Sequence, residues 1–129
     1  MIVIDNYMKI LIFFFVLFFS ATATSKDLVV KDSLLVTDQI ENVRIISGGV
    51  LQLTGIAADI YVEEGGRLIL TGIANNITNS GGNIILTGIV NVVFANSGYT
   101  EIRGIVNSHL LGKGEIKIIK GSIIGGIQQ

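Results

Sequence analysis

The sequence predicts an all-β protein in which the chain coils into a β-solenoid, that is, a single-stranded parallel β-helix. Three observations predict this fold: a unit of 16–17 residues recurs, apolar residues alternate within each unit, and each unit carries two or three glycines, which disfavour a helix. A unit this short cannot bury its own apolar side, but copies stacked about 4.8 Å apart can do so. We expect about 5–6 turns.

Composition excludes several classes of protein. The chain has 129 residues, a formal net charge of −1 and no cysteine, and its length fits one domain. The lack of cysteine excludes a disulfide framework, a thiol nucleophile, a zinc–cysteine site and a lipid-anchored cysteine. Near-zero charge argues against nucleic acid as a partner. The mean hydropathy of +0.68 suggests a membrane protein, but an apolar leader and the repeated apolar columns account for it.

The first 23 residues have the pattern of a secretory signal peptide. An apolar block over Ile10–Phe19 follows Lys9, and a small-residue cleavage site ends at Ala23. The block is too short for a membrane-spanning helix, which takes about 20 residues. We expect cleavage after Ala23, with an uncut anchor as the alternative. The exported chain would be periplasmic or extracellular, without membrane contact. The true start, Met1 or Met8, stays open.

Residues 24–39 form an N-terminal segment that precedes the repeats. Its apolar residues predict one or two strands over Asp27–Val36, which could instead fold over one end of the solenoid as a cap. The solenoid itself is expected over residues 40–129. Its clearest copies lie at residues 48–56, 65–73 and 81–89, with weaker copies at 98–105 and 113–124.

Stacking of the copies would place equivalent residues in columns along the rod. Two apolar columns are expected to face inward, namely Ile56, Ile73, Ile89 and Ile105, and Ile60, Ile77 and Val93. Two polar columns have the same spacing, namely Asn75, Asn91 and Asn107, with Ala58 in the first copy, and Thr54, Thr71 and Thr87. Corner positions are expected for the glycines that precede the isoleucines, namely Gly55, Gly72, Gly88 and Gly104.

Each polar column has a structural and a functional interpretation. The asparagines favour a corner ladder over a ligand-binding stripe, because their side chains can hydrogen-bond along the rod. A flat threonine array could organise water, as in ice-binding solenoids. One column of three that ends at Arg103 is instead typical of ordinary strand chemistry.

No group of residues predicts catalysis, a cofactor or a metal. The single histidine, His109, is expected in the inward slot of Ile60, unless the register slips and points Leu110 inward. No nucleophile motif accompanies it. Neighbouring Glu63 and Glu64 could hold calcium weakly, but a solvated turn is favoured because the calcium-binding nonapeptide is absent. Nucleotide-binding motifs are absent too, so we predict that the chain is not an enzyme.

Charges are sorted along the chain. Residues 24–66 carry seven acidic and three basic residues, whereas residues 67–129 carry two acidic and five basic ones. Because sequence order is axial order in a solenoid, the rod should be negative at its N-terminal end and positive at its C-terminal end, unless the segregation is chance. Residues 121–129 contain no amphipathic helix or proline that would cap the end. Such a rod could stack head to tail.

The Gly-Gly-x-Leu-x-Leu-x-Gly-Ile units and their spacing resemble those of bactofilins and related polymer-forming β-helix proteins, over residues 40–125. The resemblance implies a right-handed, three-sided parallel β-helix that assembles end to end without nucleotide. Bactofilins are mostly cytoplasmic, whereas this chain has an export signal and a shorter body.

We therefore expect an exported, non-enzymatic β-helix protein with a structural or scaffolding role in the cell envelope, which forms homo-oligomers through the solenoid ends. The alternative is a monomeric, secreted binding module of the immunity or adhesive type, with a protein partner on a flat sheet face. A third class, the polysaccharide-cleaving β-helices, would need a cleft of acidic and basic groups, and the sequence shows no such cluster.

Overall fold

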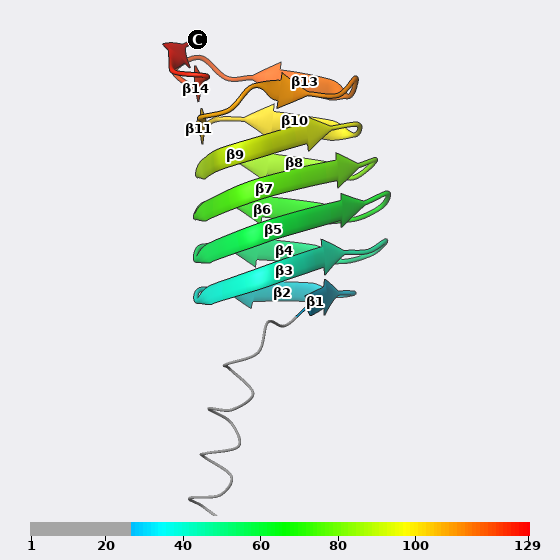
Figure 1. Cartoon of the computed structure of the whole chain (residues 1–129). Helices are drawn as coiled ribbons and strands as arrows, with labels where there is room; N and C mark the ends of the chain where they lie inside the picture. Colours follow the sequence, from blue (N-terminus) through cyan, green and yellow to red (C-terminus); the bar gives the residue numbers. More distant parts are fainter. Residues whose placement is uncertain (1–26) are drawn as a thin grey trace, which may run out of the picture.

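The computed structural model describes residues 27–129, which form an all-β solenoid of about six coils with no helix in that range (Figure 1). The predicted signal peptide and its cleavage site after Ala23 lie outside the described residues. No helix in the described part of the chain is long and apolar enough to cross a membrane. The strands are β1 (Asp27–Val30), β2 (Ser33–Val36), β3 (Gln39–Ile45), β4 (Val50–Leu53), β5 (Ile56–Glu63), β6 (Arg67–Leu70), β7 (Ile73–Ser80), β8 (Asn83–Leu86), β9 (Ile89–Asn96), β10 (Tyr99–Ile102), β11 (Ile105–Val106), β12 (Leu110–Leu111), β13 (Glu115–Ile118), β14 (Ile123–Ile124) and β15 (Ile127–Gln128).

Two sheets form the faces of the solenoid. Sheet A has the strand order β1-β3-β5-β7-β9-β11-β14-β15, with β12 also paired to β9, and sheet B has the order β13-β10-β8-β6-β4-β2. Successive coils pair in parallel, such as Leu51 with Leu68 and Leu68 with Ile84. In Figure 1 the front strands run from left to right and those behind return from right to left as the chain climbs, so the coil is right-handed. The predicted β-solenoid is confirmed.

The inward residues of sheet A differ from those predicted. The isoleucine column is in register, but its side chains are exposed or half-buried, and Ile56 is 45% exposed. The residues that follow these isoleucines face the interior instead, namely Ala57, Ala74, Val90 and Val106. The prediction that Ile56, Ile73, Ile89 and Ile105 face inward was therefore wrong. Every second residue faces inward from the buried Leu51 and Leu53 through Gly55 to Ala57, so the corner at Gly55 does not shift the inward positions by one residue.

The second inward column is shifted by one residue in β9. Opposite Asn75, β9 has two residues instead of one, which makes a β-bulge. The column therefore continues from Ile77 to the fully buried Phe94, and Val93 faces outward, contrary to the prediction. The same shift pairs Leu110 with Phe94 and leaves His109 exposed, as expected for the slipped register. The inward column is Ile60, Ile77, Phe94 and Leu110.

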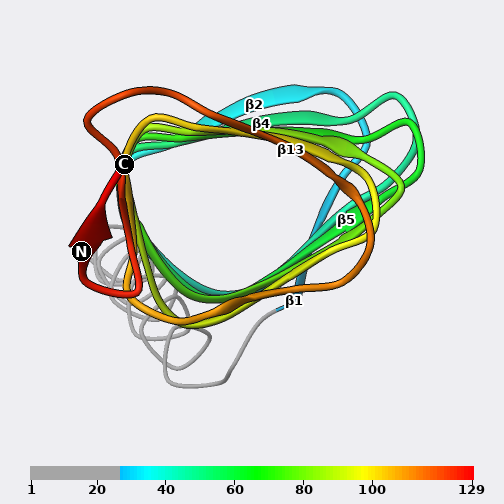
Figure 2. The ribbon, with the colours of Figure 1, turned by 90° about the horizontal axis from the view of Figure 1, so that it is seen from above.

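Sheet A bends in the middle of its long strands. In β5, Ala57 and Ile60 both face inward and the two residues between them do not, which breaks the alternation. The same break recurs in β7. Seen along the axis, the coil has a rounded, three-sided outline, with sheet B as one side and the two halves of sheet A as the others (Figure 2).

The two polar columns make hydrogen bonds between coils. At the bend, Asn91 Nδ2 donates to Asn75 Oδ1 at 3.5 Å, and Asn107 Nδ2 donates to Asn91 Oδ1 at 2.9 Å. At the other corner, Thr71 Oγ1 donates to the carbonyl oxygen of Leu53 in the preceding coil at 3.3 Å. Both columns thus bond along the rod, as a structural ladder would.

The corner glycines allow successive coils to approach closely. A Cβ on Gly72 would lie well inside 3.0 Å of the Gly55 carbonyl oxygen, and Gly88 and Gly104 stand in the same relation to the glycine one coil before them. None of these four glycines has a positive φ. Their role is therefore close backbone approach, not an unusual backbone conformation.

Two asparagines for which the sequence predicted no role lie inside the solenoid. Asn79 and Asn96 are buried and continue an inward column that begins with Val30, Ile45 and Val62. Asn79 Nδ2 donates to Asn96 Oδ1 at 2.9 Å, and Asn96 Nδ2 donates to the Glu115 carbonyl oxygen at 3.1 Å. Every buried side-chain nitrogen or oxygen in the described range has a hydrogen-bond partner.

These asparagines close the short turns between the sheets. The β5–β6 turn spans residues 64–66, and Gly66 N donates to the Glu63 carbonyl oxygen at 2.9 Å. The turns after β7 and β9 span only residues 81–82 and 97–98. There the glycine amide donates to an asparagine side chain instead, Gly82 N to Asn79 Oδ1 at 2.8 Å and Gly98 N to Asn96 Oδ1 at 3.2 Å. The side chain replaces the missing backbone acceptor.

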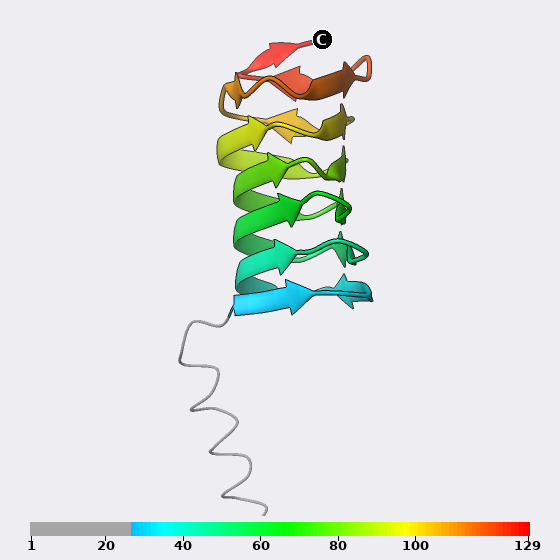
Figure 3. The ribbon, with the colours of Figure 1, turned by 90° about the vertical axis from the view of Figure 1, so that its right-hand side faces the viewer.

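The two ends of the solenoid are built differently. At the N-terminal end, β1 and β2 stack in register on β3 and β4, so residues 27–36 form a first coil. At the C-terminal end, β14 and β15 form an antiparallel hairpin, whose second strand lies above the first (Figure 3). Its two turn residues, Gly125 and Gly126, have φ values of 59° and 83°. Positive φ at both positions is typical of a type I′ turn, which favours two-residue hairpins.

Candidate functional site

The side chains considered for catalysis or metal binding do not converge. His109 is exposed, and Glu63 forms an ion pair with Arg44 rather than a site with Glu64. Among residues 27–129, no group of three or more histidine, aspartate or glutamate side chains could hold a metal ion. The candidates for function are therefore surfaces, namely a groove on sheet A and the two ends of the rod.

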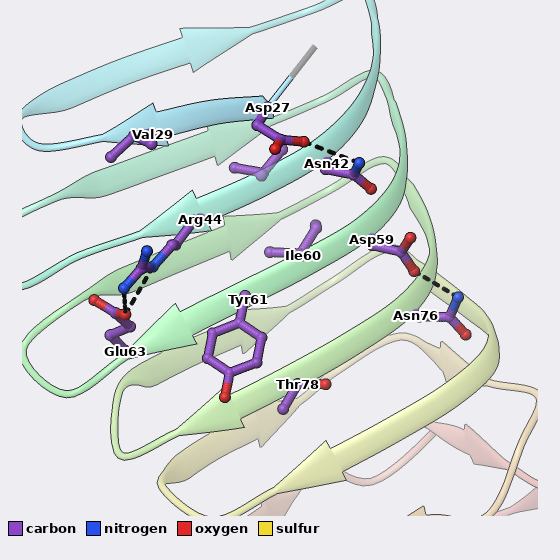
Figure 4. Close-up of a pocket in the computed structure, with 11 residues that line it drawn as sticks. Asp27, Val29, Asn42, Arg44, Asp59, Ile60, Tyr61, Glu63, Asn76 and Thr78 are labelled. Atoms are coloured by element: carbon purple, nitrogen blue, oxygen red, sulfur yellow. Dashed lines mark hydrogen bonds and ion pairs between the residues drawn. The ribbon is translucent and has the colours of Figure 1, made fainter. Parts of the chain in front are cut away.

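A groove of about 720 Å³ lies on the outer face of sheet A, toward the N-terminal end (Figure 4). Two outward-facing columns from β1, β3, β5 and β7 form most of its lining. The first column is Asp27, Asn42, Asp59 and Asn76, and the second is Val29, Arg44, Tyr61 and Thr78.

The first column alternates carboxylates and amides. Asn42 Nδ2 donates to Asp27 Oδ1 at 3.0 Å, and Asn76 Nδ2 donates to Asp59 Oδ1 at 2.7 Å (Figure 4). Each amide therefore orients one carboxylate. This column was not predicted, although Asn42, Asp59 and Asn76 are spaced by the repeat length of 17 residues. That spacing was the available signal.

The second column supplies an aromatic surface. Tyr61 is 46% exposed and lies between Arg44 and Thr78. Arg44 Nε donates to Glu63 Oε1 at 2.8 Å, so its positive charge is already paired. The carboxylates of the first column leave the groove with an excess of negative charge. An exposed tyrosine beside oriented carboxylates can hold a basic ligand through ion pairs and a cation–π contact.

The ends of sheet B are the second candidate surface. Strands β2 and β13 are its outermost strands in the described range. Their inward side chains belong to the core columns but are only partly covered, with Leu34 38% and Ile118 41% exposed, whereas Leu51 is fully buried. An unpaired strand edge beside uncovered apolar side chains is a surface on which another strand can add.

No family model matches the chain, and no curated protein or solved structure matches it either. The fold is that of a β-helix repeat protein. The groove and the sheet ends are the features from which a function can be argued.

Proposed function

We propose that this chain is an exported, non-catalytic β-solenoid with a structural role in the cell envelope. Its copies would assemble end to end, as in the bactofilins that its repeat units resemble. The assembly is the part of this proposal that the geometry of the ends supports most directly.

The supporting observation is that sheet B has a free parallel edge at each end of the rod. A second copy on the C-terminal end would add its β2 to β13 in the same strand direction. The columns of sheet B would then continue, with the incoming Leu34 on Ile116 and the incoming Val36 on Ile118. Both pairs are apolar, so the join would bury side chains that are now partly exposed.

Charge at the two ends favours the same arrangement. Residues 27–44 carry four carboxylates and two basic side chains, whereas residues 113–129 carry three lysines and one carboxylate. Head-to-tail contact therefore brings an acidic end to a basic end, and head-to-head contact does not. Such complementarity raises the association rate and selects the orientation.

We expect reversible, concentration-dependent association of residues 24–129 in sedimentation velocity. It should be weaker at 0.5 M than at 0.05 M NaCl, because the Debye length falls from more than about 10 Å to about 4 Å and exposed charges are then screened from one another. Lys117→Glu at the basic end should weaken association several-fold. Arg67→Glu, a matched change in mid-rod, should leave it unchanged. A chain that stays strictly monomeric at both salt concentrations contradicts the assembly.

A second candidate, the monomeric binding module, is favoured by the groove on sheet A. Its carboxylates and Tyr61 fit an extended basic segment of a partner protein. We expect a decapeptide that alternates arginine and serine to bind in calorimetry, and its glutamate counterpart not to bind. Tyr61→Ser should weaken binding about tenfold. Val92→Ser, at an exposed site outside the groove, should not. Equal behaviour of the two peptides would exclude this groove as a basic-peptide site.

A further inference from the structure

Strand β15 lies where the next coil of sheet A would otherwise continue. The register connects the first residues of β3 with the last residues of the chain through two columns. From the N-terminal to the C-terminal end they are Gln39, Ile56, Ile73, Ile89, Ile105, Ile123 and Gln128, and Ile40, Ala57, Ala74, Val90, Val106, Ile124 and Ile127.

A second copy stacked on the C-terminal end would bring its β3 to the same place. Along the chain, each coil passes through one half of sheet A, then the other half, then sheet B. If the incoming β1 paired with β12 and the incoming β2 with β13, the incoming β3 would therefore follow on β14. Continuing the register puts the incoming Gln39 against Ile123 and the incoming Ile40 against Ile124.

The side chains of β15 match those of the incoming strand. Gln128 already pairs with Ile123, and Ile127 already pairs with Ile124. A glutamine and an isoleucine therefore stand at the same two positions, on a strand that runs in the opposite direction. Both arrangements cannot exist at once, because β14 has one free edge.

We propose that β15 is a self-cap that imitates the start of β3 and competes with a second copy for the edge of β14. The inference rests on the end-to-end assembly proposed above and names the element that limits it. With β15 in place, the C-terminal end offers only β12 and β13 to a partner. When β15 detaches from β14, all three strands at this end, β12, β13 and β14, can pair with the second copy.

The hairpin is held weakly enough to be displaced. β15 pairs with β14 over two residues, whereas β2 pairs with β4 over four. Ile127 is 69% exposed, so little apolar surface is buried by closing the cap. Beyond the strand pair, Gly121 N donates to the Gln129 carbonyl oxygen at 3.0 Å, and Gln129 N donates to the Ser122 carbonyl oxygen at 2.8 Å. A second copy would replace this short pairing with contacts across the whole coil.

The test opens the cap without touching the rest of the rod. Gly125 and Gly126 have positive φ, and a Cβ on either meets no atom within 4 Å, so valine at both positions strains only the hairpin turn. The matched control is Gly48→Val, at a positive-φ turn in another coil where a Cβ meets only the Lys31 carbonyl oxygen at 3.7 Å. A second variant ends after Ile124 and lacks β15 altogether.

We expect both cap variants of residues 24–129 to form rods in negative stain. In sedimentation velocity, they should associate at a concentration at least about tenfold lower than the parent chain. The parent has to release β15 from β14 before a second copy can bind there, whereas the cap variants are already open. Gly48→Val should associate like the parent. Leu34→Lys, added to the Gly125→Val/Gly126→Val variant, should abolish association, since it places a charge at the apolar position of β2 that would stack on β13 of the other copy.

Other outcomes separate the two proposals. Equal association of the parent and the cap variants would overturn the self-cap and leave end-to-end assembly standing. Cap variants that are folded by circular dichroism and monomeric, together with a monomeric parent, would overturn both. Association that survives Leu34→Lys would show that the cap variants aggregate by another surface, which also overturns the self-cap.

Discussion

Replacing Gly72 with alanine should lower the free energy of unfolding by about 3 kcal/mol or more. The added Cβ would lie well inside 3.0 Å of the Gly55 carbonyl oxygen, and that oxygen accepts the backbone hydrogen bond of Ile73 N at 3.0 Å. The obstacle is backbone, so one coil has to move away from the next, in the middle of the rod. Thermal denaturation followed by circular dichroism should show a fall in Tm of more than about 12 °C.

Gly48 offers a matched control that separates close approach from backbone conformation. It has a φ of 87°, and a Cβ there meets only the Lys31 carbonyl oxygen at 3.7 Å. Gly48→Ala should therefore cost about 1–2 kcal/mol, from the left-handed conformation alone. If Gly48→Ala proves more destabilising than Gly72→Ala, the close-approach explanation of the corner glycines is wrong.

The stacking of the coils could be predicted because aligning the repeat copies also determines which residues pair between coils. The matching residues around Leu51, Leu68 and Ile84, which follow one another after 17 and 16 residues, leave one way to align the copies, and the structure pairs these residues. The direction of each side chain was harder to predict. Burying isoleucine in preference to alanine is the ordinary rule, yet Ala57 is buried and Ile56 is not, because the phase of the strand outweighs the preference of one residue.

The candidate site depended on features that a single repeat does not display. Asp59 lines the groove only because sheet A bends between Ala57 and Ile60, and the bend shows in the burial pattern of the folded strand. The C-terminal hairpin was hidden for a different reason. Gly125-Gly126 has the same residue types as the Gly-Gly pair that opens each of the three clearest copies, such as Gly65-Gly66, although it reverses the chain.

The second large effect is expected for Asn96→Ala, which should lower the free energy of unfolding by about 3–5 kcal/mol. Asn96 Oδ1 accepts hydrogen bonds from Asn79 Nδ2, Thr100 Oγ1 and Gly98 N, and its Nδ2 donates to the Glu115 carbonyl oxygen. Alanine removes all four bonds inside the core, where an unsatisfied polar group costs about 1–3 kcal/mol. Denaturant unfolding and hydrogen exchange at the Gly98 amide would measure the loss.

Asn91 is the natural comparison, because it lies on the same strand and also belongs to an asparagine ladder. It accepts from Asn107 Nδ2 at 2.9 Å, but the pair is exposed and water can replace it. Asn91→Ala should therefore cost no more than about 0.5–1 kcal/mol. If the two substitutions prove equally mild, the buried ladder does not close the short turns. Burial of Asn96 would then follow from the strand's alternation alone, and the shortening of the turns after β7 and β9 to two residues would need another cause.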